Sequence, residues 1–150
     1  MEPAANTPAG KPPAWYWVIA IVALIWMLFG VMAWVGDLMM NEAALAKMSE
    51  AQQQLYTSRP QWLFIVYAVA IFSGLAGTIG LLLRKGWSTV ALAISLAAIV
   101  VQFGYTFLAM DAVRLLGAAA ALPFPIVIFL IGLLLLWFAL RARKSGWIAA

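Results

Sequence analysis

Residues Trp62–Met110 read WLFIVYAVAIFSGLAGTIGLLL, then RKG, then WSTVALAISLAAIVVQFGYTFLAM. Neither long run contains a charged residue, and a helix of such length, at ~1.5 Å per residue, crosses a bilayer core of ~30 Å. The link Arg84-Lys85-Gly86 is so short that the two runs must lie next to each other and point in opposite directions. The pattern therefore predicts two membrane-spanning helices in a tight antiparallel hairpin.

Two further uncharged runs flank this hairpin along the chain. Of the 150 residues, 67% are hydrophobic and 9% are charged, whereas soluble domains are about 25% charged. This composition excludes a soluble globular domain and a disordered chain. We therefore expect an all-α fold, an antiparallel integral membrane four-helix bundle whose spans cover about 15–35, 62–83, 87–110 and 123–140.

The segments outside the spans have their own patterns. Residues 1–14 are rich in proline, and we expect a disordered tail there; residues 141–150 form a second, basic tail. In the outer loop 36–61, Asn41 can cap a helix, and Ser49 with Gln52 fits a capping box. We expect one or two amphipathic helices over about 38–58, on the membrane surface or capping the bundle.

The basic residues indicate the orientation. Four spans place both chain ends on one side, and that side holds six of the nine Lys and Arg, namely Lys11, Arg84, Lys85, Arg141, Arg143 and Lys144. Lys and Arg of short loops stay in the cytoplasm, so we expect cytoplasmic termini and an extracytoplasmic loop 36–61. The net charge of +4 thus reflects topology, and we expect no nucleic-acid partner.

Composition also narrows the chemistry. The chain has no Cys and no His, so metal sites with thiolate or histidine ligands are excluded. It has five acidic residues, so a metal site with several carboxylate ligands is disfavoured. No charged residue lies inside a span, although ion-coupled carriers usually place ionisable groups there. We expect no enzymatic activity, no cofactor and no metal.

The most polar patch within the spans lies on the third one, where Gln102, Tyr105 and Thr106 lie close together on the helix. An interhelical hydrogen bond is the ordinary explanation for such residues. The alternative is the wall of a small polar pocket in the outer half of the bundle, to which three more residues would contribute: Trp26, Trp34 and Asp37.

Small residues gather on the second span. Ser73 with Gly77, and Ala76 with Gly80, each match the small-xxx-small pattern that lets two helix backbones approach closely. We expect these residues to pack inside the bundle against the third span. The alternative is a seam between two copies of the chain.

Several short motifs occur together between Pro12 and Trp147. They are Trp15-Tyr16-Trp17, Pro60-Gln61-Trp62, the run Ser73–Gly80 leading to Leu81-Leu82-Leu83-Arg84-Lys85, Gln102 with Tyr105, and Leu136-Trp137-Phe138 before Arg141-Ala142-Arg143-Lys144. In these the chain resembles a group of small four-span bacterial inner-membrane proteins that are often loosely labelled "sugar transporter". The resemblance implies a bacterial inner-membrane protein and points, with less weight, to transport.

Two functional hypotheses follow. The first is a non-catalytic accessory or structural subunit of a larger membrane assembly, favoured by the small size and the uncharged spans. The alternative is an oligomeric transporter of a small uncharged, sugar-like solute, for which Gln102, Tyr105, Trp26 and Trp34 supply hydrogen bonds and stacking surfaces. The expected partners are the lipid bilayer, further copies or a larger complex, and such a solute.

Overall fold

The computed structural model describes residues 10–149, which form helices and no strand. Four helices are long and apolar enough to cross a membrane. The all-helical class and the four long apolar helices are thus confirmed for the described residues. They are α1 (Ala14–Leu38), α4 (Gln61–Leu82), α5 (Trp87–Leu108) and α8 (Pro123–Lys144). Four short helices connect them: α2 (Glu42–Ala46), α3 (Glu50–Ser58), α6 (Ala112–Leu116) and α7 (Ala118–Ala121).

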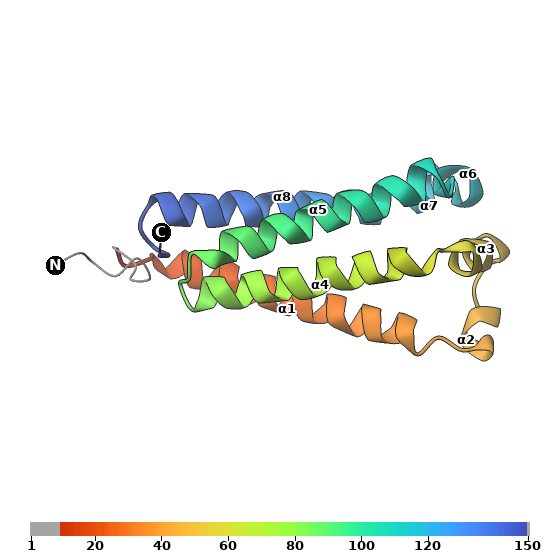
Figure 1. Ribbon diagram of the computed structural model, residues 1–150, viewed down its shortest axis with the longest axis horizontal. Helices are drawn as coiled ribbons and strands as arrows, with labels where there is room; N and C mark the ends of the chain where they lie inside the picture. Colours follow the sequence, from red (N-terminus) through yellow and green to blue (C-terminus); the bar gives the residue numbers. More distant parts are fainter. Residues whose placement is uncertain (1–9, 150) are drawn as a thin grey trace.

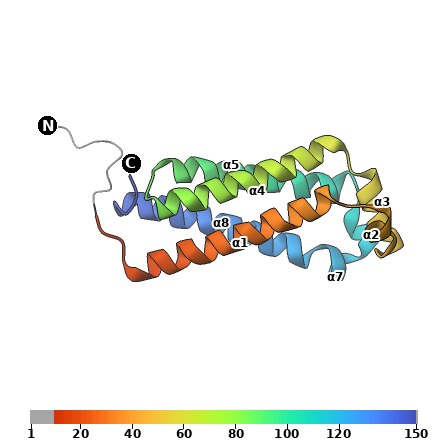
Figure 2. The same cartoon turned by 90° about the horizontal axis from the view of Figure 1, so that it is seen from below.

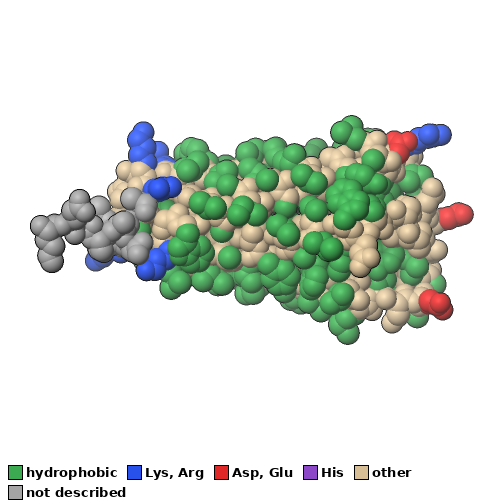
Figure 3. All heavy atoms as spheres, in the orientation of Figure 1, with side chains coloured by type: hydrophobic (Ala, Val, Ile, Leu, Met, Phe, Trp, Pro, Cys, Tyr) green, Lys and Arg blue, Asp and Glu red, His purple; other side chains and the backbone are tan. Residues whose placement is uncertain are grey.

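The long helices lie side by side in a bundle (Figure 1). Helix α1 packs on α4, α4 on α5, and α5 on α8. The start of α1, the α4–α5 turn and the end of α8 lie at one end of the bundle, which we call the basic end. The short helices lie at the other end, which we call the loop end. Figure 3 shows Lys and Arg side chains clustered at the basic end, Asp and Glu at the loop end together with a basic side chain, and hydrophobic side chains along the length between the two ends.

The helix ends follow from local chemistry. Asn41 accepts a hydrogen bond from the Ala44 N–H at 2.8 Å, and the capping box between Ser49 and Gln52 is present as predicted. Helix α8 continues to Lys144, four residues beyond the predicted span, because its last turn carries three cations that interact favourably with the negative end of the helix dipole.

Small residues set the closest helix contact, between α4 and α5. A Cβ atom added to Gly77 would lie 2.6 Å from Leu92 Cγ, and one added to Gly80 would lie 2.9 Å from Ser88 Cβ. Gly77 and Gly80 therefore pack against α5, as the packing interpretation predicts. Ser73 and Ala76 are partly exposed, and the alternative of a seam between copies stays a prediction.

Both ends of the described part of the chain are held at the basic end. The buried Tyr16 hydroxyl donates to the Leu81 carbonyl at 2.5 Å, and the Tyr16 ring lies 5.4 Å from that of Phe138. The Arg84 guanidinium donates to the carbonyl oxygens of Trp147 and Gly10. Of the tail predicted at 1–14, residues 1–9 lie outside the described residues, and residues 10–13 run along the C-terminal turn, where the Gly10 N–H donates to Gly146 at 2.8 Å.

Candidate functional site

The four long helices enclose a cavity of about 480 Å³ in the half of the bundle nearer the loop end. The cavity exists because α1 and α8 meet through aromatic side chains at the basic end and diverge toward the loop end (Figure 1). Figure 2 shows that the two helices also cross along the bundle. Residues of α1, α4, α5 and α8 line its walls, and residues of α3 lie at its mouth. We call it the loop-end cavity.

The deep part of this cavity is apolar. Its lining there includes Trp26 and Met27 of α1, Ile71 of α4, Ile99 of α5 and Ile131 of α8. Each helix contributes residues three or four apart, which share one helical face. Such a surface excludes charged groups and favours an apolar occupant.

Two polar groups in the cavity lining, the Gln102 amide and the Tyr67 hydroxyl, make no hydrogen bond to another side chain or backbone group of residues 10–149. Neither is among the fully buried unpaired polar atoms of the described chain, so both are accessible from the cavity. Their neighbours are satisfied, since the Thr106 hydroxyl donates to the Gln102 carbonyl at 2.8 Å and the Ser95 hydroxyl donates to the Ala70 carbonyl at 2.7 Å. Gln102 and Tyr67 therefore have free capacity for a ligand, with two N–H donors, one O–H donor and two oxygen acceptors.

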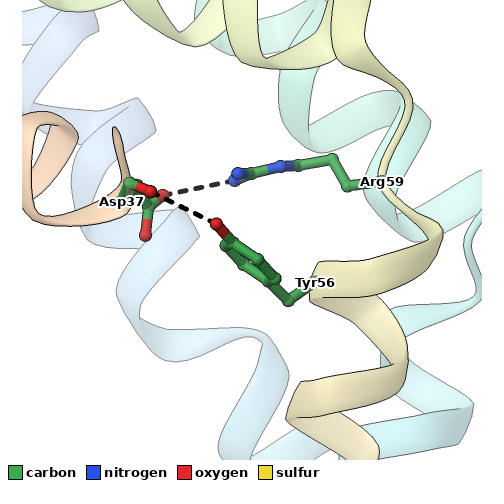
Figure 4. Close-up of polar contacts among 3 residues, drawn as sticks. All are labelled: Asp37, Tyr56 and Arg59. Atoms are coloured by element: carbon green, nitrogen blue, oxygen red, sulfur yellow. Dashed lines mark hydrogen bonds and ion pairs between the residues drawn. The ribbon is translucent and has the colours of Figure 1, made fainter. Parts of the chain in front are cut away.

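An ion pair stands at the mouth of the cavity (Figure 4). Arg59 lies 3.2 Å from an Asp37 carboxylate oxygen, and both side chains are mostly covered, with exposures of 20% and 26%. The Tyr56 hydroxyl donates to the Asp37 backbone carbonyl at 3.2 Å. The guanidinium also lies 5.0 Å from the Tyr56 ring and 5.1 Å from the Phe64 ring, within the range of cation–π attraction.

The same three residues, Asp37, Tyr56 and Arg59, also line a shallower depression of about 280 Å³ on the loop-end surface. The side chains of these three residues therefore stand between the loop-end cavity and the depression on the outer surface. Because the two opposite charges neutralise each other, the mouth carries no formal net charge.

The structure brings four of the six predicted pocket residues to the cavity: Trp26, Asp37, Gln102 and Thr106. Tyr105 and Trp34 are not part of its lining. Successive residues of a helix are about 100° apart, so Tyr105 and Thr106 lie on opposite sides of Gln102, about 60° and 40° from it. The prediction that Tyr105 shares the pocket wall is thus corrected: its ring packs edge-on against Trp62 at 4.8 Å.

Trp34 faces α4 instead of the cavity. Its ring stacks on Phe64 at 5.2 Å and lies edge-on to Phe72 at 5.3 Å. Its Nε1 atom is buried without a hydrogen-bond partner in the described part of the chain. The predicted role of Trp34 in a pocket is therefore replaced by packing between α1 and α4.

Sequence reasoning missed Tyr56, Arg59 and Tyr67. Tyr67 carries a usable signal, because a tyrosine six residues inside an apolar run lies deeper than an interface residue usually does. Arg59 carries none, because its partner Asp37 is 22 residues away across two short helices.

Comparison of the chain with protein-family models, with curated proteins and with solved structures gave no match. The chemistry of the site therefore rests on its own residues. Within residues 10–149, no three His, Cys, Asp or Glu side chains are placed to hold a metal ion. The arrangement can bind by shape, by apolar contact and by the hydrogen bonds of Gln102 and Tyr67.

Proposed function

We propose that the chain spans a bacterial inner membrane four times in antiparallel fashion, with both termini in the cytoplasm and the loop end outside. The separation of charges between the two ends (Figure 3) supports this orientation. Large hydrophobic side chains such as Val22, Phe29 and Leu134 are exposed along the helices, and lipid acyl chains would cover them.

In this setting the protein binds a small, uncharged, mainly apolar solute in the loop-end cavity, as a carrier without catalytic activity. The unpaired Gln102 amide and Tyr67 hydroxyl in an otherwise apolar cavity are the observation that carries the proposal. A ligand that pairs with either group gains a hydrogen bond with a net worth of about 0.5–1.5 kcal/mol. The volume of about 480 Å³ lies within the usual range of small-molecule sites.

The lining favours a mainly apolar solute over a sugar. A sugar ring presents hydroxyl groups around its whole rim, and each needs a partner once water is removed. The deep lining offers few such partners beside Gln102 and Tyr67. The predicted solute is therefore narrowed from a sugar-like molecule to one with a single polar group or two adjacent ones.

Transport would require the opposite end to open. In the described conformation the cavity lies toward the loop end, while Tyr16, Leu81 and Phe138 fill the bundle at the basic end. The carrier proposal assigns this conformation to the form that exchanges solute at the loop end.

Photolabelling tests the binding step. Full-length protein in phosphatidylcholine vesicles is irradiated with octanol that carries a diazirine, an uncharged probe, and the labelled residues are mapped by mass spectrometry. We expect saturable labelling of cavity-lining peptides. Gln102→Leu or Tyr67→Phe removes one hydrogen bond of about 0.5–1.5 kcal/mol and so weakens labelling about 2- to 10-fold.

Tyr105→Phe is the matched control, because it removes a hydroxyl from the same helix at a residue outside the cavity lining. It should leave labelling unchanged. Non-saturable labelling spread evenly over all outward helix faces would show that the probe reports only membrane partitioning, and the proposal would then be wrong.

The accessory-subunit hypothesis stays a prediction, and the partly exposed Ser73 and Ala76 are the residues of α4 that a second chain could approach closely. Native mass spectrometry of the protein solubilised from its own membrane tests this hypothesis. A stoichiometric complex with a different protein would favour it, and a ligand-loaded species free of other chains would favour the carrier.

A further inference from the structure

The polarity of the loop-end cavity changes along the bundle axis. Asp37 and Arg59 stand at its mouth, Gln102 and Tyr67 lie deeper, and the apolar floor includes Met27. Between Met27 and Asp37 the helix rises about 15 Å, half of a hydrocarbon core of ~30 Å. The cavity thus has the depth of one membrane leaflet, and its polarity decreases toward the bilayer centre as that of a lipid molecule does.

The cavity also reaches the side of the bundle, between α1 and α8. Helix α1 packs on α4 and α8 packs on α5, and α1 and α8 diverge toward the loop end (Figure 1). Four residues line the cavity along this seam: Phe29 and Ala33 of α1, and Phe124 and Ile128 of α8. We call them the lateral portal.

Phe29 and Phe124 are nevertheless 62% and 66% exposed at the surface of the bundle. The residues of the lateral portal therefore belong both to the wall of the cavity and to the outer surface of the bundle. In a membrane that surface faces acyl chains of the outer leaflet, so an apolar chain can pass between the bilayer and the cavity without crossing water.

We propose that the occupant of the loop-end cavity is a single-chain amphipathic lipid with an uncharged head group, which enters sideways through the lateral portal. This inference rests on the proposed function and names the class of its solute. The head group exchanges hydrogen bonds with Gln102 and Tyr67, and the chain lies against the apolar floor or extends through the portal between Phe29 and Phe124.

Charge and size select this class. Asp37 and Arg59 already neutralise each other, so a charged head group would meet no unpaired counter-ion and would lose its hydration. A volume of about 480 Å³ accommodates one chain and a small head group, whereas a phospholipid with two chains and a phosphate exceeds it.

The experiment uses full-length protein in phosphatidylcholine vesicles and a monoacylglycerol as the probe. The diazirine is placed either beside the head group or at the chain end. The diazirine-bearing octanol serves as a second, smaller probe that reaches the protein both from water and from the bilayer. Ala33→Trp fills the lateral portal. Ala97→Trp is the matched control, because Ala97 is an exposed alanine on α5 that does not line the cavity.

In the wild type we expect the head-group diazirine to label peptides that contain Tyr67 and Gln102, and the chain-end diazirine to label the floor near Met27 or the portal. Ala33→Trp should reduce cavity labelling by the monoacylglycerol about tenfold, and Ala97→Trp should not change it. Labelling by octanol should persist in both variants, because octanol has a second entry route past Asp37 and Arg59 that the substitutions leave open.

The outcomes separate the two proposals. If octanol labels the cavity and the monoacylglycerol does not, the lipid inference is wrong and the proposed function stands. If neither probe labels the cavity, both are wrong. Labelling by the monoacylglycerol that survives in Ala33→Trp excludes the lateral route. Should that variant fail to fold, the wild type decides alone: identical label sites for the two diazirine positions would overturn the inference.

Discussion

The contact of Gly77 with α5 allows the packing of the bundle to be tested by a single methyl group. In Gly77→Ala the new Cβ would lie 2.6 Å from Leu92 Cγ, 2.8 Å from Leu92 Cδ2 and 3.2 Å from the Leu92 backbone nitrogen. Leu92 is 2% exposed and belongs to the core, so it has little space to move away. Overpacking of this kind costs about 1–3 kcal/mol.

The matched control is Gly104→Ala on α5, where an added Cβ would meet no atom within 4 Å. Both substitutions gain the same helix propensity, about 1 kcal/mol, so this gain cancels in the comparison. We expect Gly77→Ala to be less stable than Gly104→Ala by about 1–3 kcal/mol. The measurement is SDS-induced unfolding in mixed micelles of a mild detergent, followed by far-UV circular dichroism.

A second substitution tests the cause. In a Leu92→Ala background the colliding Cγ and Cδ2 atoms are absent, and the penalty of Gly77→Ala should fall by about half or more, because residues in contact couple by about 0.5–3 kcal/mol. Equal stability of Gly77→Ala and Gly104→Ala would refute the close approach of α4 to α5. An unchanged penalty in the Leu92→Ala background would refute Leu92 as its origin.

Three further substitutions probe the buried polar groups. Tyr16→Phe removes the hydrogen bond to the Leu81 carbonyl and should destabilise the protein by about 0.5–1.5 kcal/mol in the same SDS titration. Arg84→Gly removes the contacts to the Trp147 and Gly10 carbonyl oxygens, while glycine tolerates the backbone φ of 57° at this position. We expect faster protease cleavage of the C-terminal turn. An unchanged cleavage rate would contradict the role of Arg84 in holding that turn. Trp34→Phe removes a buried, unpaired N–H and should cost less than about 1 kcal/mol or stabilise the protein. A loss above about 3 kcal/mol would contradict this expectation.

Local features of the chain were predictable from sequence. Apolar runs of spanning length, the capping box at Ser49 and the packing of Gly77 against the next span all depend on residues close together in the chain. The polar face with Gln102 and Thr106 was also recognisable, because residues four apart share a helix face. The predicted partners, the membrane and the orientation remain predictions.

The candidate site depended on how the helices are rotated and how they diverge. Sequence spacing placed Tyr105 and Thr106 equally near Gln102, but the rotation of α5 relative to α4 directs Thr106 to the cavity and Tyr105 to Trp62. The pairing of Arg59 with Asp37 likewise depends on the path of α2 and α3.

By itself, then, the amino-acid sequence determined that the chain forms four apolar helices joined in this order, because the preference of a segment for lipid and the reach of a short link are local properties. Only the tertiary structure decided that α1 and α8 separate at the loop end and leave a cavity with an unpaired amide and hydroxyl. The crossing of two helices depends on side-chain packing summed over both, and no short segment of either one contains that information.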